Sequence, residues 1–347
     1  MRAGIVGGGL AGSLLAWRLA RAATDWRIEL IPGERCGADA TSASGGAVRA
    51  YESHPEQRRL AIASMVELLG SSTLRRWAGY RRVGSVYLKA SADGLAAELA
   101  EIDRMLPGSV QLDGAAQLGW AGVPAEAVAV SERDAGYLAP DRLRAAVLAD
   151  AVRVTVHAGA VHTLTLGDNG TIACDGREYD TVILALGAWT GRFLRASGLP
   201  GDGYRVKSIQ YAIHRTGGWR PAHFVDELTG LYGRPTADGG LLLGLPTDVW
   251  GVDPDRPPTT AALLDRAAGL ARARFPRLRL GPAVRQVGSA DCYADQPLLA
   301  LRPVAGLQHR LFTFSGGAGG SVKTALAASH RAAIQLVEPQ LISSRTT

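Results

Sequence analysis

The sequence predicts an α/β protein made of two parts, one with a parallel sheet covered by helices and one with a mixed, largely antiparallel sheet. Toward both ends of the chain, apolar strand segments alternate with helical patterns, which is typical of a parallel sheet. Residues 204–253 instead show short alternating runs between glycine-rich turns, which is typical of an antiparallel sheet. With 347 residues, of which 47% are hydrophobic and 20% charged, the chain can bury a large core and is expected to form two domains.

The first element is a short buried strand, Ala3–Val6, that leads through a glycine-rich turn into a helix. The turn has the spacing G-x-G-x-x-G, which allows a tight turn, a close approach of pyrophosphate to the backbone, and packing of helix on strand. The unpaired N–H groups and positive dipole end of the helix suit an anion. A strand-helix turn without a ligand is the less favoured alternative. Half of a dinucleotide is therefore expected to bind at Gly7, Gly9, Leu10, Ala11 and Gly12.

The second strand, Arg27–Ile31, should end in an acid that binds the ribose hydroxyls. Pro32 stands at the first position where this acid is expected. We predict that Glu34 replaces it, next to Arg35, and that Glu29 does not, because it lies inside the strand.

The middle of the chain continues this alternation. A loop of small residues, Thr41–Arg49, indicates a close approach of backbone to a ligand, and the apolar spacing predicts helices near Pro55–Leu69 and over Leu95–Leu106, with a strand at Gly84–Leu88 between them. A further helix is predicted to open at 135–141 and to run through Leu148, and a strand is predicted at 152–156. An Asn169-Gly170 hairpin is expected between 163–166 and 171–173, and it is followed by a continuous apolar strand over 179–189.

The last third repeats the opening arrangement. A helix is predicted over Thr260–Phe275, after the antiparallel region. A strand at Arg310–Phe314, a glycine loop at 315–320 and a long helix over Val322–Val337 then form a second strand, glycine loop and helix. The N-terminus of this helix can face a second part of the same ligand.

Composition limits the function classes. The net charge is +6 and the pI is near 9.5, but the basic residues are scattered and no aromatic-interleaved stripe predicts nucleic-acid binding. An acidic protein partner, such as a carrier, is compatible with this charge. No apolar run predicts a signal peptide or membrane span, so a cytoplasmic protein is expected. Three separated cysteines and seven histidines without ligand spacing predict neither a disulfide framework nor a metal site.

Taken together, these segments resemble the D-amino-acid oxidase superfamily of FAD enzymes, in particular monomeric sarcosine oxidase and glycine oxidase. The resemblance covers nearly the whole chain in order and rests on the two glycine loops, Ser44–Arg49, Gly136–Leu138 and, most specifically, Gly187-Ala188-Trp189 after an apolar strand. It implies hydride transfer from a carbon next to nitrogen to flavin N5. It also implies a Rossmann-like FAD-binding domain from residues 1–82, 136–202 and 286–340, and a substrate domain from residues 83–135 and 203–285.

The resemblance also assigns residues by position. Arg49 lies on the flavin side. The implied FAD contacts are Gly7, Gly9, Leu10, Ala11, Gly12, Glu34, Arg35, Ser42, Ser44, Gly45, Gly46, Val161, Gly187, Ala188, Trp189, Gly316, Gly317, Ala318, Gly319 and Gly320.

Three positions depart from the sarcosine oxidases. Glu52 stands where they carry a substrate-binding arginine, and Gly320 where they carry a carboxylate-binding lysine, which Lys323 is expected to replace. Gly251 stands where they carry an oxygen-activating lysine. The flavin scaffold is therefore retained, whereas the sarcosine-specific residues are lost, which leaves open whether the substrate carries a free carboxylate.

Other candidates for substrate contact are Tyr51 and His54, near the expected flavin face, and Arg234, on the predicted roof sheet, where it would bind a substrate anion. Packing or surface roles are the alternatives. The predicted function is FAD-dependent oxidation of an amine or amino-acid-like C–N bond. A flavin monooxygenase or reductase that uses NAD(P)H, and an inactive FAD-binding scaffold, are the alternative functions.

The attachment of the flavin depends on the segment Asp291-Cys292-Tyr293. Sarcosine oxidases attach FAD through a cysteine two residues before a tyrosine, and aligning the tyrosines puts Asp291 at that position. In a strand, a one-residue offset turns a side chain to the opposite face. A non-covalent FAD is therefore predicted, with Cys292 as an ordinary buried thiol.

Overall fold

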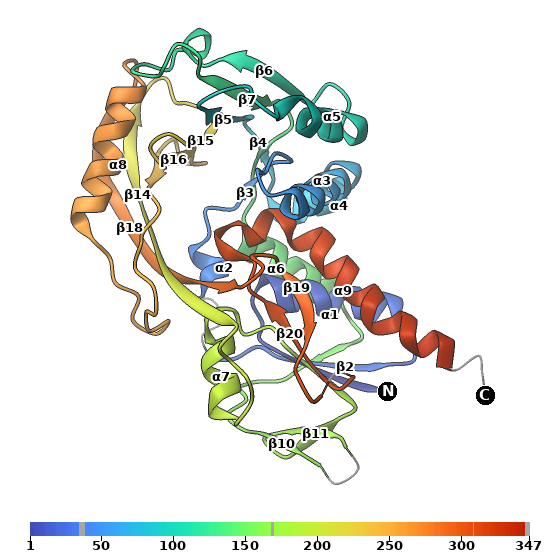
Figure 1. Cartoon of the computed structure of the whole chain (residues 1–347). Helices are drawn as coiled ribbons and strands as arrows, with labels where there is room; N and C mark the ends of the chain where they lie inside the picture. The colour runs from blue at the N-terminus through green and yellow to red at the C-terminus, as the bar shows by residue number, and fades with distance from the viewer. Residues whose placement is uncertain (35–38, 168–169, 308, 344–347) are drawn as a thin grey trace.

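The computed structural model describes residues 1–34, 39–167, 170–307 and 309–343, with side chains up to residue 338. Its first strand lies inside a six-stranded sheet of order β19-β20-β13-β1-β2-β9 (Figure 1). Every neighbouring pair is parallel except β19 and β20. The predicted parallel sheet that begins at the first residues is confirmed. The strands are β1 (Arg2–Val6), β2 (Arg27–Ile31), β9 (Val154–Val156), β13 (Thr181–Leu184), β19 (Ala300–Pro303) and β20 (Leu311–Ser315).

Helices cover one face of this sheet. The apolar side of α1, with Leu14, Leu15 and Leu19, packs into the core that also holds Ile5 of β1. The C-terminal α9 packs between α1 and α3. A proline in the first turn begins both α3 and α6, where its missing N–H costs no hydrogen bond. The helices are α1 (Leu10–Ala22), α3 (Pro55–Gly70), α4 (Ser72–Ala78), α6 (Pro140–Asp150) and α9 (Ser321–Ser343).

A small antiparallel sheet, β10 (Leu164–Leu166), β11 (Ile172–Cys174) and β12 (Arg177–Tyr179), contributes to the core on the other face. The predicted pairing of 163–166 with 171–173 is confirmed, while Asn169 of the predicted turn lies outside the described residues. The strand predicted over 179–189 is too long. β13 ends at Leu184, and residues 187–189 form a 3-10 helix (η2) because the chain turns at Gly187, where φ is +53°. The short α7 (Thr190–Ala196) follows.

The second large sheet has eight strands in the order β18-β14-β17-β16-β15-β5-β7-β6. Only β15 and β5 are parallel, so the prediction of a mixed, largely antiparallel sheet is confirmed. Two strands are longer than the short runs that the sequence predicted, because β14 and β18 pair along almost their whole length. The strands are β5 (Ser85–Lys89), β6 (Val110–Gly114), β7 (Val128–Glu132), β14 (Tyr204–Gly217), β15 (His223–Asp226), β16 (Tyr232–Pro235), β17 (Leu241–Gly244) and β18 (Arg279–Ala294).

Helix α8 (Ala261–Arg274) covers the outer face of this roof sheet (Figure 1). Leu241 and Leu243 belong to the outer core beneath α8, whereas Leu242 packs with Tyr211 in a separate cluster. Successive side chains of a strand point to opposite faces of its sheet. Leu241 and Leu243 therefore lie on the outer face, and Leu242 lies on the inner face, which is turned toward the parallel sheet. The remaining helical elements are α2 (Ala40–Ala43), α5 (Leu95–Met105), η1 (Ala116–Leu118) and η3 (Ala318–Gly320).

The chain crosses between the two large sheets at a three-stranded sheet formed by β3 (Ala47–Val48), β8 (Gly136–Tyr137) and β4 (Arg81–Arg82). The two sheets draw their strands from the segments that the sequence assigns to two domains, except that β18 runs across the predicted boundary at residue 286. No helix in the described part of the chain combines the length and apolar character that a membrane span needs.

Candidate functional site

A cavity of about 1010 Å³ lies between the carboxyl ends of β1, β13 and β20 and the inner face of the roof sheet. Its volume lies at the upper end of the range for small-molecule sites. The wall on the parallel-sheet side includes the two glycine loops, the loop after α2, the turn after β13, and residues 32–34 and 160–162. Ligands of open α/β sheets bind at this edge of the sheet.

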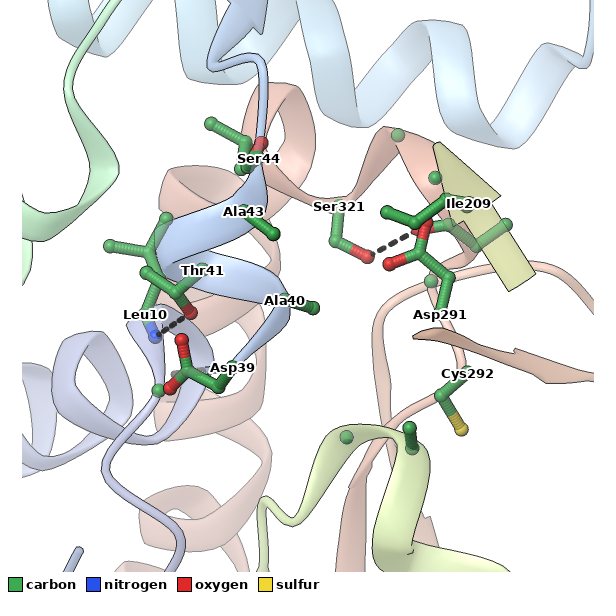
Figure 2. A pocket seen from close by; sticks show the side chains of 18 of the residues that line it. Leu10, Asp39, Ala40, Thr41, Ala43, Ser44, Ile209, Asp291, Cys292 and Ser321 are labelled. Atoms are coloured by element: carbon green, nitrogen blue, oxygen red, sulfur yellow. Dashed lines mark hydrogen bonds between the residues drawn. The ribbon is translucent and has the colours of Figure 1, made fainter. Parts of the chain in front are cut away.

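The first glycine loop brings the start of α1 to this cavity. Gly9 caps α1 without a side-chain hydrogen bond, and the first turn carries no acid. The Leu10 N–H donates to Thr41 Oγ1 at 2.9 Å, which fixes α2 beside the helix start (Figure 2). Gly12 does not line the cavity. A Cβ there would lie 2.0 Å from the Gly7 carbonyl oxygen, so this glycine allows α1 to pack against the loop.

The acid expected at the end of the second strand is found on the cavity wall. Glu34 and Val161 both line the cavity, near its first glycine loop. Glu29 is buried in the sheet instead, where Arg2 donates to it at 2.8 Å and Tyr179 at 3.1 Å. The hydrogen bond from Arg2 lowers the Glu29 pKa to about 2, against the effect of burial. The predicted contact Arg35 lies outside the described residues.

Most of the predicted cofactor residues come together at this cavity. Ser42 does not, because its hydroxyl bonds to Asp39 and Asp141 at 3.3 and 3.0 Å. The predicted residues on the wall are Gly7, Gly9, Leu10, Ala11, Glu34, Ser44, Gly45, Gly46, Val161, Gly187, Ala188, Trp189, Gly316, Gly317, Ala318, Gly319 and Gly320.

Tyr51 and His54 lie away from the cavity, although they follow Arg49 closely in sequence. Tyr51 is buried and its hydroxyl donates to Glu98 at 3.0 Å. His54 is exposed and caps α3, accepting the Gln57 N–H at 3.4 Å. The chain turns from the cavity toward α3 after Arg49, so these two residues contribute packing and capping there.

Arg49 and Lys323 line the cavity and share one carboxylate. Glu52 Oε1 lies 2.6 Å from Arg49 Nη2 and 2.6 Å from Lys323 Nζ. Although burial opposes it, the charges of Arg49 and Lys323 lower the pKa of Glu52, and burial lowers the pKa of Lys323. A Cβ at Gly320 would lie 2.8 Å from Lys323 Cε, so Lys323 occupies the space beside Gly320.

Arg234 lines the cavity from β16 and is also held by protein groups. Its Nε donates to the Gly45 carbonyl, and its Nη1 donates to the Pro235 carbonyl at 2.9 Å. The guanidinium lies 4.2 Å from the centroid of the Tyr137 ring. Burial lowers the pKa of Arg234. The predicted anion-binding arginine therefore ties the roof sheet to the loop after α2.

His223 is a cavity residue that the sequence analysis did not select. Its Nδ1 lies 3.0 Å from Ser85 Oγ, and it is 4% exposed. Burial, with the charges of Arg49 and Lys323, holds its pKa well below the ordinary value, so it offers an uncharged imidazole. The period-two pattern of β15 could have placed it on the inner face, but nothing local in the sequence indicates which face is inner.

Asp291 lines the cavity from β18, and burial raises its pKa to about 6. Its carboxyl group lies beside Gly319 of the second glycine loop and points toward the start of α9, whereas the thiol of Cys292 points the other way (Figure 2). Cys292 is a free thiol at the cavity wall, and burial raises its pKa to about 12. The adjacent residues Asp291 and Cys292 therefore place a carboxyl group and a thiol group at the cavity wall.

The wall suits an extended dinucleotide. Two helix starts and their glycine loops face one cavity, and the acid Glu34 lines the same cavity. Trp189 is fixed by a 3.0 Å hydrogen bond from Nε1 to Asp255 Oδ1. In the described residues, no group of three or more His, Cys, Asp or Glu side chains could hold a metal ion.

Comparison with known families and structures supports this interpretation of the wall. Residues 2–333 match the family described as FAD dependent oxidoreductase (DAO). No curated protein matches the sequence significantly.

Among solved structures, the fold is similar to iminodiacetate oxidase from Chelativorans sp. BNC1, with 21% identity, a TM-score of 0.73, and 97% of this chain and 95% of that chain covered. It is also similar to glycine oxidase from Geobacillus kaustophilus, with 20% identity, a TM-score of 0.74 and the same coverage. L-proline dehydrogenase from P. horikoshii gives 17% identity and a TM-score of 0.75, with 97% and 93% covered.

Proposed function

Because the chain belongs to the DAO family of FAD-dependent oxidoreductases, we propose that it oxidises a C–N bond of an amine or amino-acid-like small molecule. The observation that carries this proposal is the single cavity onto which both glycine loops and the inner roof sheet open. The similar structures include an iminodiacetate oxidase, a glycine oxidase and an L-proline dehydrogenase. When bound, the flavin supplies the acceptor for the hydride.

The proposed FAD contacts are those of the predicted set that line the cavity, and the proposed FAD is non-covalent. Segments 1–82, 136–202 and 286–340 are proposed to hold FAD, and 83–135 and 203–285 to bind substrate. Three residues of the chain are proposed to act near the substrate. Arg49 and Lys323 supply a buried electrostatic environment, and His223 supplies an uncharged hydrogen-bonding group that can orient the amine.

The roof sheet is proposed to exclude water from the reacting carbon, because its inner face closes the cavity opposite the glycine loops. A carrier-bound substrate is a further proposal, motivated by the net charge of +6. An acidic carrier would associate more slowly at high ionic strength.

Anaerobic flavin bleaching tests the function. We expect purified protein to be yellow and to bleach with a subset of amines or imino acids but not with NADPH. Bleaching by NADPH instead would favour the monooxygenase or reductase class. A yellow protein that dithionite bleaches, but no amine, imino acid or NADPH does, would favour the inactive scaffold, and a colourless protein that takes up no FAD would refute the cofactor proposal.

A further inference from the structure

Three side chains from two distant segments form a buried corner of the cavity, which we call the Glu52 corner: Arg49 and Glu52, three residues apart, and Lys323. Their side chains are 7%, 11% and 11% exposed. The two cations line the cavity and approach the same carboxylate oxygen of Glu52, each at 2.6 Å. A pair of cations around one carboxylate oxygen is the arrangement that would bind the carboxylate of a ligand. Here a side chain of the protein takes that place.

Two of the three side-chain nitrogens of Arg49 already face protein groups. Its Nε donates to the Tyr51 carbonyl at 2.9 Å, and its Nη2 pairs with Glu52. Its guanidinium carbon lies 5.1 Å from the centroid of the Tyr87 ring. One of the two edges through which a guanidinium can make paired hydrogen bonds to a carboxylate, the Nε–Nη2 edge, therefore faces protein groups.

Lys323 is held in the same way. Its ammonium is paired with Glu52, and its side chain lies over Gly320. An external carboxylate would have to displace Glu52 from both cations and leave that carboxylate buried without a partner, which is costly. Lys207, another lysine of the wall, lies over the ring of the partly exposed Trp250 and is not part of this corner.

The cavity also carries the acid Asp291, which lies opposite Lys207 in the pairing of β14 with β18. In the described part of the chain, no ion pair or hydrogen bond holds the Asp291 carboxyl, and burial alone raises its pKa. A cationic amine would give this acid a partner. Asp291 is therefore a carboxyl group with which a ligand amine can pair, whereas the two cations of the Glu52 corner already face a carboxylate.

We infer that Glu52 is an internal carboxylate that fills the anion site between Arg49 and Lys323, so that the enzyme takes an amine whose reacting carbon bears no free carboxylate. This inference rests on the proposed function for its substrate class. Glu52 is then a specificity-determining residue, since it excludes α-amino acids from a site that would otherwise bind them. Removing it should create an anion site next to the flavin.

The test replaces Glu52 in the holoenzyme by Ala and by Asp and titrates each protein with sodium acetate, following the melting temperature and the flavin absorption spectrum. Acetate should bind E52A at least tenfold more tightly than wild type, raise its melting temperature and perturb its flavin spectrum. E52D retains the carboxylate and should behave as wild type. Acetamide and sodium chloride at equal concentration should have no such effect, because neither has the shape and charge of a carboxylate.

Glu98→Ala is the matched control. Glu98 pairs with the buried Arg58 at 3.0 Å, outside the cavity, and Arg58 keeps a second partner in Glu101 at 2.8 Å. E98A should lower the melting temperature without an acetate-dependent change in the flavin spectrum. If E52A does not fold, the same acetate titration is carried out on E52Q, because this variant keeps the side-chain volume and removes the charge. Acetate binding by wild type as tight as by the folded variant would overturn the inference.

Turnover gives a second measurement. Isobutylamine and valine differ only by the α-carboxylate, and wild type should bleach faster with isobutylamine-like amines than with their carboxylated counterparts. E52A should shift the ratio of their KM values at least tenfold toward the carboxylated member. A wild-type preference for the carboxylated member would refute the inference. The acetate titration needs no turnover, so a protein that oxidises no amine but gains acetate binding in E52A would refute the proposed function and still support the assignment of Glu52.

Discussion

The two ends of the cavity are built differently. The nucleotide end is made of backbone, where glycine loops bring helix starts to the carboxyl ends of parallel strands. The Glu52 corner is made of side chains from two separate segments, residues 49 and 52 in one and residue 323 in the other. Backbone recognition depends on a local turn, whose geometry the glycine spacing sets. Side-chain recognition depends on tertiary contacts, and in the proposed role of Glu52 a single acid determines which charge this corner accepts.

The largest expected effect concerns the backbone end. Gly12→Ala would place a Cβ 2.0 Å from the Gly7 carbonyl oxygen, which cannot be relieved without moving α1 away from the loop. We expect the free energy of unfolding to fall by about 3 kcal/mol or more and bound FAD to be lost. Urea unfolding and the ratio of flavin to protein absorbance measure both effects.

Gly269→Ala is the control for this change, because Gly269 lies within α8 and a Cβ there would meet nothing within 4 Å. It should stabilise the protein by about 1 kcal/mol and leave the flavin content unchanged. A Gly12→Ala protein with wild-type stability and flavin content would show that the nucleotide end does not depend on this close approach.

The sequence predicted the backbone-built end of the cavity better than the end that is built from side chains. The glycine spacing predicted the first strand, the turn and α1, because all three follow one another directly in the first 22 residues and their geometry is local. The sequence did not predict that β14 and β18 pair over most of their length, since pairing partners far apart leave no local pattern. Likewise, Glu52 was identified as a departure, but its two partners required knowing how α9 packs against the loop before α3.

The second effect, of intermediate size, concerns Asp291, whose side chain lines the cavity. Burial raises its pKa to about 6 from the ordinary 3.8, so the folded state binds this proton more tightly than the unfolded state. The group therefore stabilises the fold at low pH, and that contribution is lost as the pH rises through about 6. Since one pKa unit corresponds to about 1.4 kcal/mol, Asp291→Asn should raise the free energy of unfolding by about 1–3 kcal/mol at pH 8.

This gain should disappear between about pH 6 and pH 4, which urea unfolding at several pH values measures. Asp265→Asn, on the exposed face of α8, serves as the control and should change stability little at any pH. A gain that is equal at pH 4 and pH 8 would mean that the buried charge of Asp291 is not its cause.

The smallest expected effect concerns Cys292, at the boundary between the two ends. A thioether to the flavin would require a reactive thiolate, but burial raises the Cys292 pKa to about 12, so the thiol stays protonated at neutral pH. Asp291 occupies the position that aligns with the linking cysteine, and the Cys292 thiol points away from the Asp291 carboxyl (Figure 2). Cys292→Ser should therefore leave flavin content and spectrum unchanged. Acid precipitation of wild type should release the yellow colour into the supernatant. A yellow pellet that becomes colourless in C292S would instead identify Cys292 as a covalent link and show that the strand presents its thiol to the flavin.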